Sequence, residues 1–220
     1  MLKSITMRRA SAVAVCALLA GCASPKPVAY TGIASSSQLR ADPDDESGHI
    51  PYRYQTQVDW QNYDKVIIDP VAIYRGADHQ FGDMSDADKN ALGSYMGTRF
   101  AQSLSKRFLA AGTPDRHTLR LKLTLTGAET TTPVIGTFTH IDLAGNLYNG
   151  VQAIRGGEGL IAGSVIYSVE IYDASSARLL AAYISKQYPG ALNIGASFGS
   201  LSAAETGIDK GAEALVAQLR

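Results

Sequence analysis

The stretch that decides the fold is Leu119-Arg120-Leu121-Lys122-Leu123-Thr124-Leu125-Thr126, in which apolar and polar residues alternate throughout. Successive side chains of a β-strand point to opposite faces of its sheet, so the leucines share one face. This alternation is typical of a strand that lies between a core and solvent. We therefore expect the leucine face to meet the core and the opposite face to meet water.

Strand patterns on either side of this stretch extend the predicted sheet. Residues 65–74, KVIIDPVAIY, are rich in β-branched and aliphatic side chains, and Pro70 predicts a bulge, a break or an edge within them. Alternation returns at residues 165–171, and a second strand pattern at residues 179–187 follows turn-forming residues at 173–177. We expect these last two patterns to form a β-hairpin.

Two helices are predicted. The first begins after Ser85, because Asp88 stands in the capping-box position and Asp86 adds negative charge to the first turn. Its apolar stripe, which recurs every four residues before a stop at Gly112, is Leu92, Met96, Phe100, Leu104 and Phe108. The second starts near Ser202 and presents Ile208, Ala212, Leu215 and Leu219. This order predicts an α+β fold: a mainly antiparallel sheet with two principal helices packed on one face.

A family resemblance is carried by three stretches. Residues 60–71 (WQNYDKVIIDPV), the leucine strand, and VEIYD at 169–173 before LLAA at 179–182 resemble the domain of unknown function 3313 family of bacterial lipoproteins. The similarity covers roughly residues 58–219. The resemblance implies no established activity, so candidate chemistry has to be sought in the residues themselves.

The amino terminus has the parts of a short secretory signal. Lys3, Arg8 and Arg9 give it positive charge, and residues 10–20 are almost entirely apolar or small. A helix of that length rises about 17 Å, well short of the roughly 30 Å hydrocarbon core of a bilayer. We therefore expect this segment to direct export and not to span the membrane.

Leu19-Ala20-Gly21-Cys22 ends the signal and resembles the lipobox of bacterial lipoprotein precursors. The resemblance implies that the Cys22 thiol receives a diacylglycerol, that the bond after Gly21 is cut, and that the new amino terminus is acylated. Two or three acyl chains anchor a protein nearly irreversibly. Ala23 occupies the sorting position and favours the outer membrane, with the domain facing the periplasm. The alternative is an ordinary signal peptide with an incidental cysteine.

Loss of residues 1–21 changes the composition of the mature chain. It removes three of the 20 basic residues and none of the 20 acidic ones, which leaves a formal charge of −3. Nucleic-acid binding needs a clustered basic face, so we expect no nucleic-acid partner. Cys16 leaves with the signal and Cys22 carries the lipid, so the mature chain is expected to form no internal disulfide.

Residues 22–57 are predicted to be a lipid-anchored flexible tether, followed by a single periplasmic domain at residues 58–220. The tether is rich in proline, serine and acidic residues, so it buries too little apolar surface to offset the entropy of ordering it. Fully extended, it would reach about 115 Å. The exceptions that could dock on the domain are Tyr30, Ile33, Tyr52 and Tyr54.

The segment from Thr130 to Gly157 is apolar, glycine-rich and poor in charge. A structureless loop of this length is uncommon in a compact domain unless it has a function. Three interpretations stay open: a contact with a partner or lipid, a short core helix near residues 141–153, or disorder. The residues proposed for a partner contact are Val134, Ile135, Phe138, Ile141, Leu143, Leu147 and Tyr148.

Three patterns suggest chemistry, and each has a simpler explanation. The stretch at 195–199, GASFG, matches the nucleophile elbow, yet every histidine precedes Ser197, so the base expected after it is missing. Asp83 and the two aspartates at 86 and 88 miss the calcium-loop spacing and fit a capped helix start. His140 and Asp142 lack the third ligand of a zinc site. We expect no catalytic residue, no metal and no cofactor.

The sequence therefore favours a non-enzymatic, lipid-anchored cell-envelope lipoprotein. We expect it to act as an accessory protein that binds another envelope component through the 130–157 segment. A ligand- or lipid-binding periplasmic protein is the alternative, and a hydrolase ranks third. Neither the identity of the partner nor the oligomeric state is encoded in these patterns.

Overall fold

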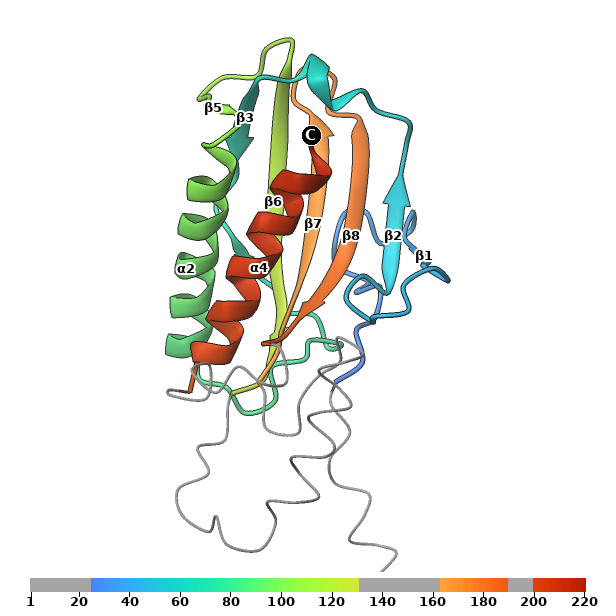
Figure 1. The fold of residues 1–220 in the computed structure, drawn as a ribbon. Coiled ribbons are helices and arrows are strands. Elements are labelled where there is room, and N and C mark those ends of the chain that lie inside the picture. Colours follow the sequence, from blue (N-terminus) through green and yellow to red (C-terminus); the bar gives the residue numbers. More distant parts are fainter. Residues whose placement is uncertain (1–24, 131–162, 190–199) are drawn as a thin grey trace, which may run out of the picture.

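One large sheet and two helices make up the part of the chain that the structure describes, which is residues 25–130, 163–189 and 200–220 of a computed structural model (Figure 1). Within these residues the sheet has eight strands in the order β1-β2-β8-β7-β6-β3-β5, and β4 also pairs with β6. The strands are β1 (Arg40–Ala41), β2 (Tyr52–Gln55), β3 (Lys65–Ile68), β4 (Ala72–Ile73), β5 (Leu109–Ala110), β6 (Thr118–Ala128), β7 (Val165–Asp173) and β8 (Leu179–Gln187).

The leucine strand is β6, and it lies at the centre of the sheet. It pairs along its length with β7 in antiparallel fashion, and its other edge pairs in parallel with β3 and then β4. None of its four leucines is more than 2% exposed. Pro70 lies between β3 and β4, which confirms the predicted break, because a proline nitrogen cannot donate to a ladder.

The predicted hairpin is confirmed by β7 and β8, which pair antiparallel from Val165↔Gln187 to Tyr172↔Leu179. Asp173 closes its turn. The Oδ1 atom of Asp173 accepts hydrogen bonds from the backbone N–H of Ser176 at 2.8 Å and from the Ser175 hydroxyl at 2.7 Å. Ala177 takes a left-handed conformation with φ of 57° to complete it.

Helix α2 (Asp86–Leu104) starts as predicted. The Ser85 hydroxyl accepts from the backbone N–H of Asp88 at 3.1 Å and donates to its side chain at 2.8 Å. The helix ends before Phe108, because the chain turns into β5 and donates from Leu109 N–H to the Asp64 carbonyl at 2.9 Å. Phe108 is still buried, so it joins the core from outside the helix.

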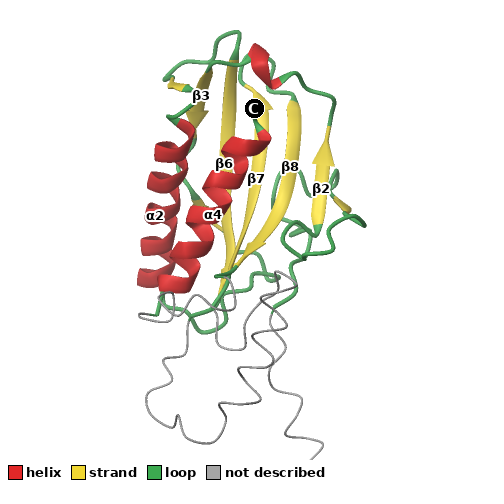
Figure 2. Ribbon diagram, viewed as in Figure 1, coloured by secondary structure: helices red, strands yellow, loops and turns green. Residues whose placement is uncertain are grey.

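The second predicted helix is α4 (Ser202–Gln218), and it lies beside α2 (Figures 1 and 2). Helix α4 contacts β7 and β8, whereas α2 contacts β3 and β4. Tyr95 and Arg99 of α2 both bond to Asp209 of α4. Apolar side chains from both helices and from β6, β7 and β8 form one cluster, which we call the first core. The mixed α+β class with a mostly antiparallel sheet is confirmed.

The structure differs from the predicted tether, because residues 28–56 pack on the sheet. β2 pairs with β8 along Tyr52–Gln55, and Tyr30, Ile33 and Leu39 are buried. They belong to a second cluster, the second core, whose buried members are Tyr30, Ile33, Leu39, Tyr74, Ile166, Leu179, Ala182 and Ile184. This stretch has few apolar residues, but they pack against an apolar face of the sheet. The free energy gained by burying this apolar surface offsets the conformational entropy lost when the stretch becomes ordered.

The expectation that the polar face of β6 meets water holds for only part of the strand. Arg120, Lys122 and Thr124 are partly exposed, whereas Thr126, near the end of the strand, is fully buried. Along β7 the side chains alternate between the two cores: Val165 and Tyr167 join the first core, and Ile166 joins the second. The sheet is therefore covered on both faces along β7.

Gly211 of α4 provides a test of this packing. A methyl group at Gly211 would overlap the hydroxyl of Tyr167, whose side chain is 1% exposed in the first core. We expect Gly211→Ala to lower the free energy of unfolding by about 1–3 kcal/mol, despite the better helix propensity of alanine. Chemical denaturation measures this change.

The matched control is Gly112→Ala. A methyl group at Gly112 meets nothing within 4 Å, so its effect should stay within about 0.5 kcal/mol. Equal stability of the two variants would contradict the close approach of α4 to β7.

Candidate functional site

Most of the residues that the sequence singles out lie outside the described residues. This holds for the lipobox, Leu19, Ala20, Gly21 and Cys22, and for the proposed partner-contact residues, Val134, Ile135, Phe138, Ile141, Leu143, Leu147 and Tyr148. It also holds for Ser197, His140 and Asp142. The structure does describe the points at which the chain enters and leaves these stretches.

These points gather at one end of the sheet, where β6 ends and β7 begins. Pro25 and Thr130 line the same pocket there, and the backbone of Glu129 donates to the Ser164 carbonyl at 2.8 Å. The end of β6, the start of β7, the end of β8 and the start of α4 all lie at this end (Figure 1). We call it the Pro25 end.

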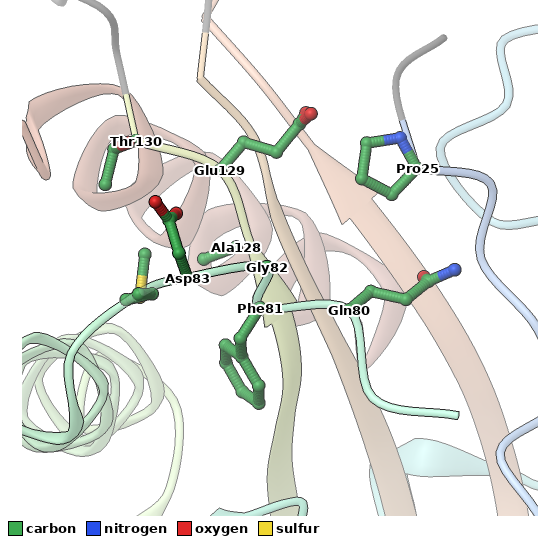
Figure 3. Close-up of a pocket in the computed structure, with 9 residues that line it drawn as sticks. Pro25, Gln80, Phe81, Gly82, Asp83, Ala128, Glu129 and Thr130 are labelled. Carbon is green, nitrogen blue, oxygen red and sulfur yellow. The ribbon is translucent and has the colours of Figure 1, made fainter. Parts of the chain in front are cut away.

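A pocket of about 370 Å³ lies at the Pro25 end (Figure 3). Three separate stretches of the chain line it: the first described residue, the loop before α2, and the end of β6. The lining residues are Pro25, Gln80, Phe81, Gly82, Asp83, Met84, Ala128, Glu129 and Thr130.

The wall of the pocket depends on a short parallel bridge between Gln80 and Gly127. Gln80 N–H donates to the Thr126 carbonyl at 2.9 Å, and Ala128 N–H donates to the Gln80 carbonyl at 3.1 Å. A Cβ atom at Gly127 would lie 2.6 Å from the Gln80 carbonyl oxygen, so only glycine permits this approach.

The Gln80 side chain ties the start of the described chain to this bridge. Its Oε1 accepts from the Tyr30 hydroxyl at 2.7 Å, and its Nε2 donates to the Lys26 carbonyl at 2.7 Å. Burial raises the pKa of Tyr30 to about 12, so its hydroxyl stays protonated and able to donate at neutral pH. Lys186 Nζ donates to the Pro25 carbonyl at 3.2 Å. Residues 25–30 are thus held at the end of the sheet.

The lining of the pocket combines apolar residues with carboxylates. Phe81 and Met84 are buried in the first core, and the Phe81 ring points away from the other lining side chains, whereas Asp83 is exposed (Figure 3). The Glu129 carboxylate accepts from the Ser164 hydroxyl at 2.8 Å. Among the residues that the structure describes, no group of three or more His, Cys, Asp or Glu side chains could hold a metal ion. Such a lining can bind through shape and hydrogen bonds.

The aspartates before and within α2 serve the helix start. Asp88 completes the cap with Ser85, and Asp86 pairs with Lys89 at 3.2 Å. The structure therefore supports the interpretation of a capped helix start at this position. Asp83 is separate from this cap and lines the pocket instead.

Sequence reasoning missed a groove between α2 and the edge of the sheet, with a volume of about 590 Å³. The sequence feature that could have indicated this groove is the pair Gly93 and Gly97, which lie one helical turn apart. A Cβ atom at Gly93 would lie 2.9 Å from Ile73 Cδ1, so the glycine lets α2 approach β4 closely. The groove is lined by Pro70, Val71, Ile73, Asn90, Gly93, Ser94, Gly97 and Thr98.

Comparison with protein families shows one match. The model of the family described as protein of unknown function (DUF3313) matches residues 29–215, and the chain belongs to this family. The match starts well before residue 58, in agreement with the packing of residues 28–56 on the sheet.

No curated protein is significantly similar in sequence. No helix in the described ranges has the length and apolar character needed to cross a bilayer.

Solved structures show weak similarity. A PelC dodecamer from Paraburkholderia phytofirmans is 13% identical, with 73% of this chain and 96% of that chain covered and a TM-score of 0.38. A DUF330 protein from Xanthomonas campestris is 10% identical, with coverages of 69% and 81% and a TM-score of 0.35. A candidate lipoprotein from Caulobacter crescentus is 11% identical, with coverages of 69% and 83% and a TM-score of 0.27. We transfer no function from them.

Gln80→Ala tests how residues 25–39 are held. The substitution removes both side-chain hydrogen bonds, and we expect a local loss of about 1–2 kcal/mol, or roughly tenfold faster amide exchange in peptides covering residues 28–39. Hydrogen–deuterium exchange with mass spectrometry measures the rate.

The control is Gln55→Ala, at an exposed side chain in β2. It should leave exchange in residues 28–39 unchanged. If Gln80→Ala also left it unchanged, Gln80 would not hold this segment.

Proposed function

We propose that this member of the DUF3313 family is a non-enzymatic lipoprotein of the cell envelope, anchored through Cys22 at the outer membrane. Its domain would face the periplasm and bind another envelope component. The observation that carries this proposal is the location of Pro25 and Thr130, which line one pocket. The anchored start of the chain and the start of the apolar 130–157 segment therefore belong to the same end of the fold.

The anchor is supported by the lipobox sequence and by the short distance in sequence from Cys22 to the fold. Lys186 and Gln80 bind the backbone at Pro25 and Lys26. The chain thus passes from the expected lipid into ordered structure within a few residues. An anchor followed directly by a folded domain is suited to presenting that domain at a fixed place on a membrane.

The binding role is supported by the composition of the 130–157 segment and by its place of attachment. A contiguous apolar surface on a folded protein is a typical docking surface. The adjoining pocket adds the ring of Pro25 and the carboxylates of Asp83 and Glu129 (Figure 3). These side chains favour recognition of a partner by shape and hydrogen bonding.

A ligand- or lipid-binding protein is the second candidate. The pocket of about 370 Å³ favours it, since small-molecule sites measure about 300–1,000 Å³. In that case protein extracted under native conditions should carry a bound small molecule in native mass spectra.

Cys22→Ala tests the anchor. The variant should lack the added mass of the lipid, because no thiol remains to receive it. Intact-mass spectrometry of protein extracted from membranes measures this mass. Cys16→Ala is the matched control, and its product should keep the lipid because Cys16 leaves with the signal. A lipid-sized added mass that persists in Cys22→Ala, or that is missing from the unsubstituted chain, would refute the anchor.

Photo-crosslinking tests the binding role. A photo-crosslinking amino acid at Phe138 or Tyr148 should give discrete adducts with an envelope component in intact cells. The same group at Asp115, which lies in the loop before β6, should not. Deletion of residues 131–157 from the lipidated chain should also remove the partner from the co-purified set. An unchanged set of partners would rule out the role assigned to this segment.

A further inference from the structure

We propose that the Pro25 end of the fold faces the lipid bilayer, and that the opposite end, with the β7–β8 turn and the loop before β6, points away from it. The inference rests on the proposed function, because it takes the lipid on Cys22 as the point of attachment. The surface that the Pro25 end meets is the headgroup layer of the membrane that holds this lipid.

The connection between lipid and fold is short. Pro25 follows Cys22 by three residues, which extend to at most about 11 Å. The connection also ends at a fixed point, because the Pro25 carbonyl accepts from Lys186 and the Lys26 carbonyl accepts from Gln80. Five residues after Pro25, Tyr30 is 1% exposed in the second core. The connection of about 11 Å between Cys22 and Pro25 is roughly a tenth of the 115 Å reach that the sequence predicts for the tether.

The domain is much longer than this connection. Strand β6 covers Thr118–Ala128 and rises about 36 Å. Ala128 lines the pocket beside Pro25, whereas Thr118 lies at the other end, where Lys65 pairs with Asp115 at 2.7 Å. A connection of about 11 Å lets only the first of these ends approach the headgroups.

The charge at the Pro25 end is mixed. Asp83 and Asp86 are exposed there, and so is Lys26, so the end carries groups that anionic headgroups repel and one that they attract. We attribute the orientation to the short connection, which requires no affinity of this end for lipid.

One consequence concerns the 130–157 segment. Thr130 lies at the Pro25 end, and Gly163, where the described chain resumes, directly precedes Ser164, which bonds to Glu129. Both attachment points are thus close to the membrane. The partner that we propose for this segment would be met at the membrane surface.

The test uses the full lipidated chain in vesicles of phosphatidylethanolamine and phosphatidylglycerol that contain a headgroup quencher. A fluorophore is attached at Asp83→Cys or at Arg116→Cys, both exposed positions at opposite ends. Lipid blocks Cys22, so only the new thiol reacts. Each variant is also made with twenty Gly and Ser residues inserted between Ser24 and Pro25, which adds a coil of roughly 25 Å.

We expect several-fold stronger quenching at Asp83→Cys than at Arg116→Cys, and loss of this difference in the inserted variants. Equal quenching without the insertion would overturn the orientation. A difference that persists with the insertion would overturn the role of the short connection and point to intrinsic affinity of this end for lipid. Intact mass before reconstitution separates the two proposals: absence of lipid refutes the anchor and with it the orientation, whereas lipidated protein with equal quenching refutes the orientation alone.

Discussion

Burial on both faces of strands β7 and β8 is the constraint on which the rest of the structure depends. All nine residues of β8 are buried, as are the first seven of β7. Because side chains alternate across a sheet, helices on one side can cover only half of them. The remaining side chains, such as Ile166 and Ile184, need a second cover. Residues 28–39 and Tyr74 provide it, so the stretch that the sequence predicts to be a tether is part of the fold.

The same constraint builds the Pro25 end. Between Tyr74 in the second core and Phe81 in the first core, the chain goes from one face of the sheet to the other at the end where β6 and β8 stop. Gln80 lies in this segment, where its backbone pairs with β6 and its side chain binds Tyr30 and Lys26. The pocket lies between the first described residue, the loop before α2 and the end of β6. Its position close to the expected anchor is therefore a result of how the sheet is covered.

Elements with a strong local pattern could be predicted from the sequence. The alternating leucines identify β6, and Ser85 with Asp88 identifies the start of α2. The second cover could be predicted only in part: Tyr30 and Ile33 are expected from the sequence to be able to dock on the domain, and both are buried in the second core. Its extent could not be predicted, because its buried residues are widely spaced among polar ones and their partners lie far away in sequence. Ser35 is an example: its N–H donates to the buried Glu170 carboxylate at 2.6 Å, across 135 positions. The candidate pocket escaped prediction for the same reason, since Gln80 and Gly127 have no local signature.

The pairing of β2 with β8 also sets an order for folding. Strand β2 has its partner strand more than a hundred residues later, at Leu179–Gln187. Closing such a long loop is slow compared with forming the β7–β8 hairpin or a single helix. Residues 52–55 therefore stay unpaired until β8 has formed. In this fold, a strand close to the start of the described chain is among the last to take its native place.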